Sequence, residues 1–158
     1  MKRQLLKLPL LIFFIILFIF FYLLIIERNP SKIPSALLEK KFPNFEAETL
    51  LENKKFISSE QFGKEIVLVN FFATWCAPCR DEHPFIKLFS DKKKIKIIGI
   101  NYKDNSEKTK KWLKELGNPY NIIALDKNGQ IAIDWGVYGI PETFVINSKG
   151  IIKYRYVG

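Results

Sequence analysis

Cysteine and histidine are scarce in this chain. Its 158 residues include two cysteines, Cys76 and Cys79, and a single histidine, His83. A structural zinc site commonly draws four ligands from these residue types, so that class of site is excluded, and a three-ligand metal carrier remains as a minor alternative. A haem attachment motif is excluded as well, because it requires histidine directly after the second cysteine, where this chain has Arg80.

A nucleic-acid-binding motif is also absent from the sequence, although the net charge is +9. The lysines are dispersed in short groups at residues 40–41, 54–55, 92–94 and 108–114. We therefore expect solvated lysine faces and no nucleic-acid partner, with attraction to anionic lipid headgroups as a secondary effect.

The two cysteines form a Cys-x-x-Cys pair at an informative position. They lie in Trp-Cys-Ala-Pro-Cys-Arg, residues 75–80, separated by two residues from an apolar run at 66–72 that predicts a strand. At the start of the next helix, the partial positive charge of the helix N-terminus stabilises the thiolate of Cys76. Cys79 follows one turn later, within reach to attack a mixed disulfide. The pattern predicts thiol–disulfide exchange, with Cys76 as the more exposed cysteine of lower pKa.

A static disulfide is the alternative interpretation of this pair. Such a bond would close a very short loop and restrict the unfolded chain little. We therefore favour a redox-active pair.

The N-terminal region predicts a membrane anchor. Residues 1–7 are basic, and residues 8–26 are apolar almost throughout, close to the roughly 20 residues that span a bilayer. A cleaved signal peptide normally has an apolar region of about 7–15 residues and a small-residue cleavage site, which residues 25–29 do not offer. The basic flank favours a cytoplasmic N-terminus and a domain on the periplasmic side, joined to the anchor by a linker at 27–41.

Residues 42–158 carry the pattern of one mixed α/β domain with a central sheet and flanking helices. Apolar runs typical of strands alternate with helical patterns, and a hairpin closes the chain. The helix at 76–89 is expected to turn Phe85, Ile86 and Leu88 inward. The predicted elements are strands at 66–72, 95–100 and 122–125, hairpins at 49–56 and 143–156, helices at 76–89 and 105–116, and helical turns at 58–62 and 131–135.

The order of strand, Trp-Cys-x-x-Cys, helix and a late Ile-Pro before a strand resembles thioredoxin. Residues 136–144, Gly-Val-Tyr-Gly-Ile-Pro-Glu-Thr-Phe, resemble the Gly-Val-x-Gly-x-Pro-Glu-Thr-Phe signature of the DsbE/CcmG family. These are membrane-anchored periplasmic thiol–disulfide proteins of cytochrome c maturation. Residues 101–104 and 112–120 are similar to that family too, and the resemblance extends from the anchor onward.

The resemblance implies roles for particular residues. Cys76 matches the nucleophile and Cys79 the resolving cysteine. Pro141 matches a proline whose cis peptide bond faces the cysteines, an isomer that proline adopts at little cost. Glu82 and Glu142 match acidic residues near the dithiol that tune it and help to recognise partners.

Asn70 occupies the place where thioredoxin keeps a buried aspartate as proton acceptor. Asparagine cannot accept a proton in this way, so we expect a nearby carboxylate, Glu82 or Glu142, to replace it. Tyr138 is expected to line the groove beside the cysteines. Trp75 is expected to shield the nucleophile or to dock a partner.

The resemblance also implies a reaction and its partners. The protein is expected to reduce apocytochrome c or a haem-lyase component, without a bound cofactor, from the bacterial inner membrane into the periplasm. A membrane electron donor of the DsbD or CcdA type would reduce it again. Two alternatives remain: a thioredoxin-like reductase with another extracytoplasmic client, and a copper-delivery protein that uses Cys76, Cys79 and His83, the last expected on a helix surface.

Members of that family continue past the closing hairpin into a final helix, whereas this sequence stops at Gly158. Either the sequence is a fragment, or one face of the sheet is less covered. The domain at 42–158 is thus expected to lack its C-terminal helix.

Overall fold

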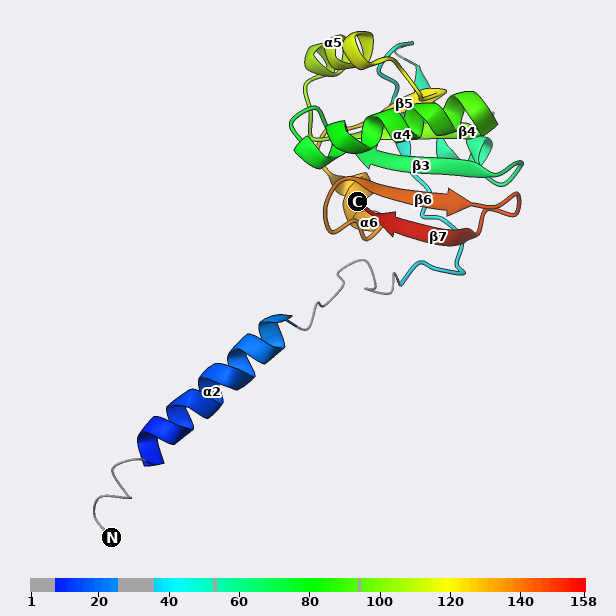
Figure 1. Ribbon diagram of the computed structural model, residues 1–158. Helices are drawn as coiled ribbons and strands as arrows, with labels where there is room; N and C mark the ends of the chain where they lie inside the picture. The colour runs from blue at the N-terminus through cyan, green and yellow to red at the C-terminus, as the bar shows by residue number, and fades with distance from the viewer. Residues whose placement is uncertain (1–7, 26–35, 53, 94) are drawn as a thin grey trace. The chain divides into compact units, whose positions relative to one another are not determined.

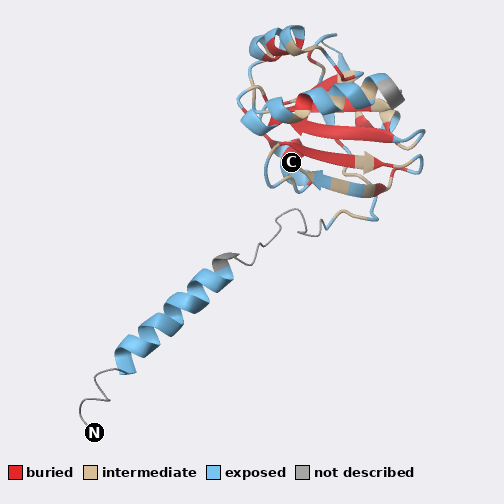
Figure 2. Cartoon of the chain, in the orientation of Figure 1, coloured by how far each residue is buried: buried red, intermediate tan, exposed pale blue. Residues whose placement is uncertain are grey.

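The computed structural model describes residues 8–25, 36–52, 54–93 and 95–158, and it comprises two compact units, Met1–Lys32 and Ile33–Gly158. In the first unit, helix α2 (Leu8–Ile25) consists of apolar residues apart from one tyrosine, and its described side chains are exposed (Figures 1 and 2). No helix in the described part of the chain has both the length and the hydropathy of a membrane span. The last residue of the expected anchor, Ile26, lies outside the described residues.

The second unit is built on a five-stranded mixed sheet. Strands β3 (Val67–Phe72), β4 (Lys96–Tyr102) and β5 (Ile122–Asp126) run parallel, and β6 (Glu142–Ile146) and β7 (Ile152–Val157) are added antiparallel beside β3, in the order β5-β4-β3-β6-β7. Every residue of β3 is buried, as expected of a central strand covered on both faces (Figure 2). The predicted mixed sheet is therefore confirmed.

One face of the sheet is covered by small elements and an aromatic core. They are the hairpin of β1 (Glu46–Glu48) and β2 (Lys55–Ile57), the short helix α3 (Ser58–Gln61), and α6 (Gln130–Asp134). Alternate β3 residues point to this side, where the fully buried Trp135 contacts the rings of Phe45, Phe62, Phe71 and Phe144.

The opposite face packs against the two longer helices, α4 (Ala77–Lys93) and α5 (Ser106–Leu116). Leu68 and Phe72 of β3 point to this side, and Phe72 stacks on the rings of Trp112 and Tyr120. Both cysteines belong to the hydrophobic cluster on this face of the sheet, so the dithiol lies on the side of α4 and α5.

Two expectations about local structure require correction. The predicted hairpin at 49–56 uses strands at 46–48 and 55–57 instead, because the chain leaves β1 at Thr49 and Leu50 to join β5. The helix α4 extends to Lys93, and Ile86 is half-buried, while Phe85 and Leu88 are exposed.

Helical periodicity explains the orientation of α4. Cys79, His83 and Ile86 follow one another at spacings of four and three, and they form the stripe that faces the core. Phe85 and Leu88 form a second stripe, turned away from the first.

Candidate active site

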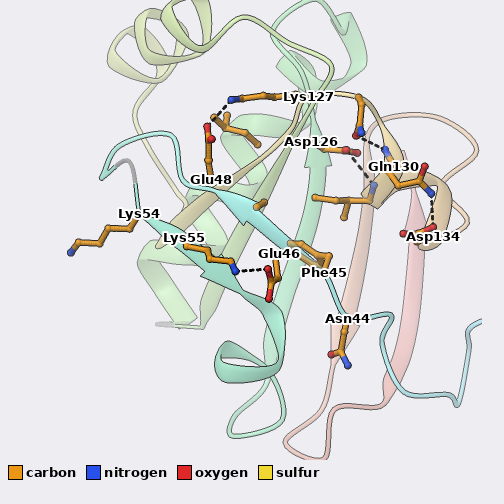
Figure 3. Close-up of a pocket in the computed structure, with 14 residues that line it drawn as sticks. Asn44, Phe45, Glu46, Glu48, Lys54, Lys55, Asp126, Lys127, Gln130 and Asp134 are labelled. Atoms are coloured by element: carbon orange, nitrogen blue, oxygen red, sulfur yellow. Dashed lines mark hydrogen bonds and ion pairs between the residues drawn. The ribbon is translucent and has the colours of Figure 1, made fainter.

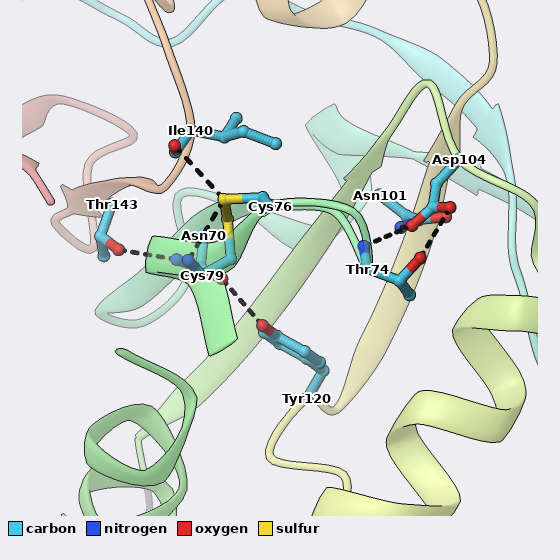
Figure 4. The surroundings of a disulfide bond; sticks show 9 residues. All are labelled: Asn70, Thr74, Cys76, Cys79, Asn101, Asp104, Tyr120, Ile140 and Thr143. Carbon is cyan, nitrogen blue, oxygen red and sulfur yellow. Dashed lines mark hydrogen bonds between the residues drawn. A yellow bond between two sulfur atoms is a disulfide. The ribbon is translucent and has the colours of Figure 1, made fainter. Parts of the chain in front are cut away.

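The dithiol lies at the junction of the central strand and the first long helix. Cys76 and Cys79 form a disulfide with a Cα–Cα distance of 5.3 Å (Figure 4). The backbone N–H of Cys79 donates to Cys76 Sγ at 3.1 Å. In the reduced protein, this amide and the N-terminus of α4 favour the thiolate of Cys76. The residues are 5% and 3% exposed, so the expected difference in exposure is slight in the disulfide state.

A distant segment of the chain faces the disulfide. The peptide bond between Ile140 and Pro141 is cis, which confirms the expectation for this position. The carbonyl oxygen of Ile140 lies 3.4 Å from Cys76 Sγ (Figure 4). The backbone of Ile140 therefore borders the sulfur of the more N-terminal cysteine.

A buried polar network lies beneath the dithiol. The Tyr120 hydroxyl donates to Asn70 Oδ1 at 2.8 Å, and Asn70 Nδ2 donates to Thr143 Oγ1 at 3.0 Å (Figure 4). Burial raises the pKa of Glu82, although interactions with the Asn70 and Thr143 side chains lower it in part. Burial, with the nearby Glu82 charge, also raises the pKa of Tyr120 well above its ordinary value. Tyr120 therefore stays a neutral donor, and Glu82 holds a proton more readily than an exposed glutamate.

Glu142 lies on the other face of the sheet. Successive strand residues point to opposite sides, so Thr143 reaches the Asn70 network and Glu142 points away from it. Glu142 is fully buried and forms a bidentate ion pair with Arg155, with both N–O distances 2.8 Å. The two acidic residues singled out in the sequence are thus separated, and only Glu82 interacts with the network.

The segment before Cys76 is held by a loop that follows β4. Asp104 accepts hydrogen bonds from Thr74 N at 2.6 Å and Thr74 Oγ1 at 3.0 Å (Figure 4). The indole N–H of Trp75 donates to the Lys103 carbonyl at 3.2 Å. The sequence resembles the family at residues 101–104 but predicts no role for Asp104, since a hydrogen bond across 30 positions leaves no local pattern.

An aromatic hollow of about 300 Å³ lies near the dithiol, since it is lined by Trp75, the chain neighbour of Cys76, and by Ile140, whose carbonyl oxygen contacts Cys76 Sγ. Exposed rings of Trp75 and Tyr138 stand at its edge. Its lining residues are Trp75, Tyr102, Val137, Tyr138, Gly139 and Ile140. The hollow therefore offers aromatic and apolar contact surface close to Cys76.

A larger hollow of about 930 Å³ lies between the β1–β2 hairpin and residues 125–134 (Figure 3). Its charged side chains largely pair with one another, as Lys55 does with Glu46 and Lys127 with Glu48. Neither the cysteines nor Trp75 and Ile140, which neighbour Cys76, line this hollow, so it is separate from the dithiol.

His83 is buried, contrary to the expectation of a helix-surface residue. Its Nε2 lies 2.8 Å from the carbonyl oxygen of Gly117, and its ring contacts Trp112. Burial is the main reason why its pKa is lowered, and the charges of Lys87 and Arg80 lower it further. Within the described ranges, no three His, Cys, Asp or Glu side chains are arranged to hold a metal ion. The ring nitrogen that contacts the Gly117 carbonyl, Nε2, could bind a metal ion only if that contact were broken.

The comparisons with known proteins agree with this geometry. Residues 37–158 match the family model described as Redoxin. The thiol:disulfide interchange protein DsbE of Vibrio cholerae is 41% identical over 161 residues, which cover 100% of this chain and 87% of that protein. The thiol:disulfide interchange protein CycY of Rhizobium leguminosarum is 43% identical over 131 residues, covering 83% of this chain and 70% of that protein.

A solved structure extends the match to three dimensions. A thiol:disulfide interchange protein DsbE from Chlorobium tepidum aligns with a TM-score of 0.67 at 26% identity, over 75% of this chain and 83% of that one. The fold is therefore thioredoxin-like, and the family match and the curated relatives make the chain a thiol–disulfide oxidoreductase. The chain belongs to the DsbE/CcmG family of thiol:disulfide interchange proteins.

Proposed function

We propose that this oxidoreductase reduces a disulfide in apocytochrome c, or in a haem-lyase component, on the periplasmic side of a bacterial inner membrane. One observation carries the proposal. The Cys76–Cys79 pair faces the cis Ile140–Pro141 segment, in a chain that matches DsbE of Vibrio cholerae over its whole length.

The reaction proceeds by two exchanges. The Cys76 thiolate attacks one sulfur of the client disulfide, forms a mixed disulfide and releases the other client sulfur as a thiolate. Cys79, as its thiolate, then attacks Cys76 Sγ and releases the second client thiolate. Two electrons pass to the client, and the enzyme is left with the Cys76–Cys79 disulfide, which is the state of the structure.

Glu82 accepts the proton that Cys79 loses before its attack. The support is that its carboxyl interacts with the Asn70 and Thr143 side chains and that burial raises its pKa above the ordinary value. A base of this kind is most effective when its pKa lies near the working pH. Tyr120 and Thr143 hold the Asn70 amide and so act as positioning residues for this step.

The N-terminal helix anchors the enzyme, and residues 1–7 lie in the cytoplasm. The apolar composition of α2 and the exposure of its described side chains support this part of the proposal. A dithiol donor of the DsbD or CcdA type in the same membrane then supplies the two electrons that restore the reduced enzyme.

The test is to trap the client. A Cys79→Ala variant of the full chain, expressed in the native cell, cannot resolve the mixed disulfide and should accumulate it. Mass spectrometry of the captured complex should identify apocytochrome c or a haem-lyase component, and a Cys76→Ala, Cys79→Ala variant should capture neither. Reproducible capture of unrelated exported proteins alone would establish a different client and overturn the proposal.

A further inference from the structure

We propose that Arg155 is a positioning residue for client binding, because it holds, through Glu142, the Tyr138–Ile140 segment that faces Cys76. The proposal deepens the proposed function, since it rests on the client being a polypeptide disulfide. Arg155 lies in the last strand, β7, and neither the composition nor any motif of the sequence points to it.

The buried ion pair connects the last strand to the cis-proline segment. Arg155 Nε and Nη2 donate to the two carboxylate oxygens of Glu142, and the side chains are 3% and 0% exposed. Glu142 Oε1 also accepts from the backbone N–H of Tyr138 at 2.9 Å and, at 3.4 Å, from that of Gly139. Arg155 thereby fixes the carboxylate, and the carboxylate fixes the backbone just before Ile140.

The guanidinium also supports the Tyr138 ring. The Cζ atom of Arg155 lies 4.7 Å from the ring centroid, within the range of a cation–π contact. The Tyr138 residue is 71% exposed, so this contact restrains a ring that is otherwise largely surrounded by solvent. The same ring forms one edge of the aromatic hollow beside the dithiol. One arginine thus restrains both the backbone and a side chain of the segment.

The pairing of the last two strands fixes Arg155 relative to Glu142. In the antiparallel register, Phe144 lies opposite Arg155 and Glu142 opposite Val157, so the two charged residues are diagonal neighbours on one face. This is the face opposite to the Asn70 and Thr143 network. A change at Arg155 should therefore alter docking and leave the proton-accepting groups in place.

The test compares a peptide disulfide with a small disulfide. The full chain in detergent is reduced, and its exchange kinetics are measured with an oxidised Cys-x-x-Cys-His peptide and with hydroxyethyl disulfide. For Arg155→Met we expect KM for the peptide to rise about tenfold, equivalent to about 1.4 kcal/mol. The kcat for the peptide, the rate with hydroxyethyl disulfide and the Cys76 pKa should stay as in the wild type. An equal loss with both substrates, or an unchanged KM, would overturn the proposal.

A matched control lies on the same strand. Lys153 pairs with Glu39, but their side chains are 38% and 66% exposed, and neither contacts residues 138–140 in the described structure. Lys153→Met should leave KM for the peptide unchanged. A tenfold rise in this variant would show that any charge lost from the strand has the same effect, which would also overturn the proposal.

A second variant covers the case in which Arg155→Met does not fold. Arg155→Lys keeps the positive charge but loses the bidentate geometry and the planar contact with Tyr138. We expect a smaller rise in KM from Arg155→Lys, and a folded variant with wild-type KM would refute the role.

The proposed client class is judged separately. If the wild type fails to reduce the Cys-x-x-Cys-His peptide, the proposed client class is wrong. The ratio of KM between Arg155→Met and the wild type is then measured with an oxidised peptide of different cysteine spacing.

Discussion

Replacing Glu82 with glutamine should slow the release of client and stabilise the fold at the same time. Glutamine keeps the size of the side chain and its ability to interact with Asn70 and Thr143, but it cannot accept a proton. The variant therefore removes the proposed base with little change in packing.

The expected kinetic effect follows from how Glu82 is placed. General-base catalysis contributes typically 10²–10⁴-fold. Glu82 is only partly buried, so water can replace it in part, and we expect a loss near the lower end of that range. The resolution step should slow about 100-fold at neutral pH, equivalent to about 2.7 kcal/mol in activation free energy.

The effect on stability has the opposite sign. Burial raises the pKa of Glu82 from 4.5, so the folded protein holds this proton more tightly than the unfolded chain does. The resulting stabilisation is complete below about pH 4.5 and is lost as the pH rises through the folded-state pKa. The charged carboxylate thus disfavours the fold at neutral pH, and Glu82→Gln should raise the free energy of unfolding there.

The assay is a single-turnover measurement of mixed-disulfide resolution between pH 5 and 9, in about unit steps, since general-base steps follow the ionisation of the base. The wild-type rate should rise with pH through the raised pKa of Glu82, and the variant should lose this rise. Its Cys76 pKa should also fall, since a negative charge near the thiolate is removed. Asp81→Asn, an exposed acid on the same helix, is the control. If Glu82→Gln keeps the wild-type rate, pH profile and thiol pKa, Glu82 is not the base.

Three further predictions concern the thiols, the anchor and the buried histidine. In the reduced protein, iodoacetamide at neutral pH should label Cys76 before Cys79, and faster labelling of Cys79 would reverse the assignment of nucleophile and resolving cysteine. The mature protein should retain residues 8–26 and stay with membranes after alkaline carbonate extraction, whereas a soluble form that begins after Ile26 would identify a signal peptide. Because burial lowers the pKa of His83 from 6.5, the unfolded chain binds this proton more readily, and the free energy of unfolding should fall as the pH drops below about 6.5. Chemical denaturation across this range should show a weaker fall for His83→Gln, and an identical slope in the two proteins would contradict the assignment.

Local patterns were sufficient to find the dithiol and the sheet. The apolar run of β3, the helix start at Cys76 and the Ile140–Pro141 pair each depend on a few neighbouring residues, and the structure has all three where the sequence predicts them. Such features need no knowledge of which distant segments meet.

The contacts across the sheet could not be predicted in this way. The sequence predicts both Glu82 and Glu142 near the dithiol, but it does not predict on which face of the sheet Glu142 lies, because the face of a strand residue depends on register and a shift of one residue reverses it. The sequence predicts His83 on a helix surface. Its burial depends on contacts with α5 and the residue that follows it, and because α5 lies far along the chain, no local pattern indicates them. Asp104 and Arg155 were missed for the same reason, since their partners lie 30 and 13 positions away.

The adjacent pair Glu142 and Thr143 has a consequence for how client range can change. Glu142 contacts the segment before Ile140 on one face of the sheet, and Thr143 contacts the buried amide of Asn70 on the other face. A laboratory selection for new clients should therefore accumulate substitutions on the Glu142 side, around Tyr138, while the Thr143 side stays constant. Recognition and sulfur chemistry can then evolve separately, although the residues that divide them are neighbours in the chain.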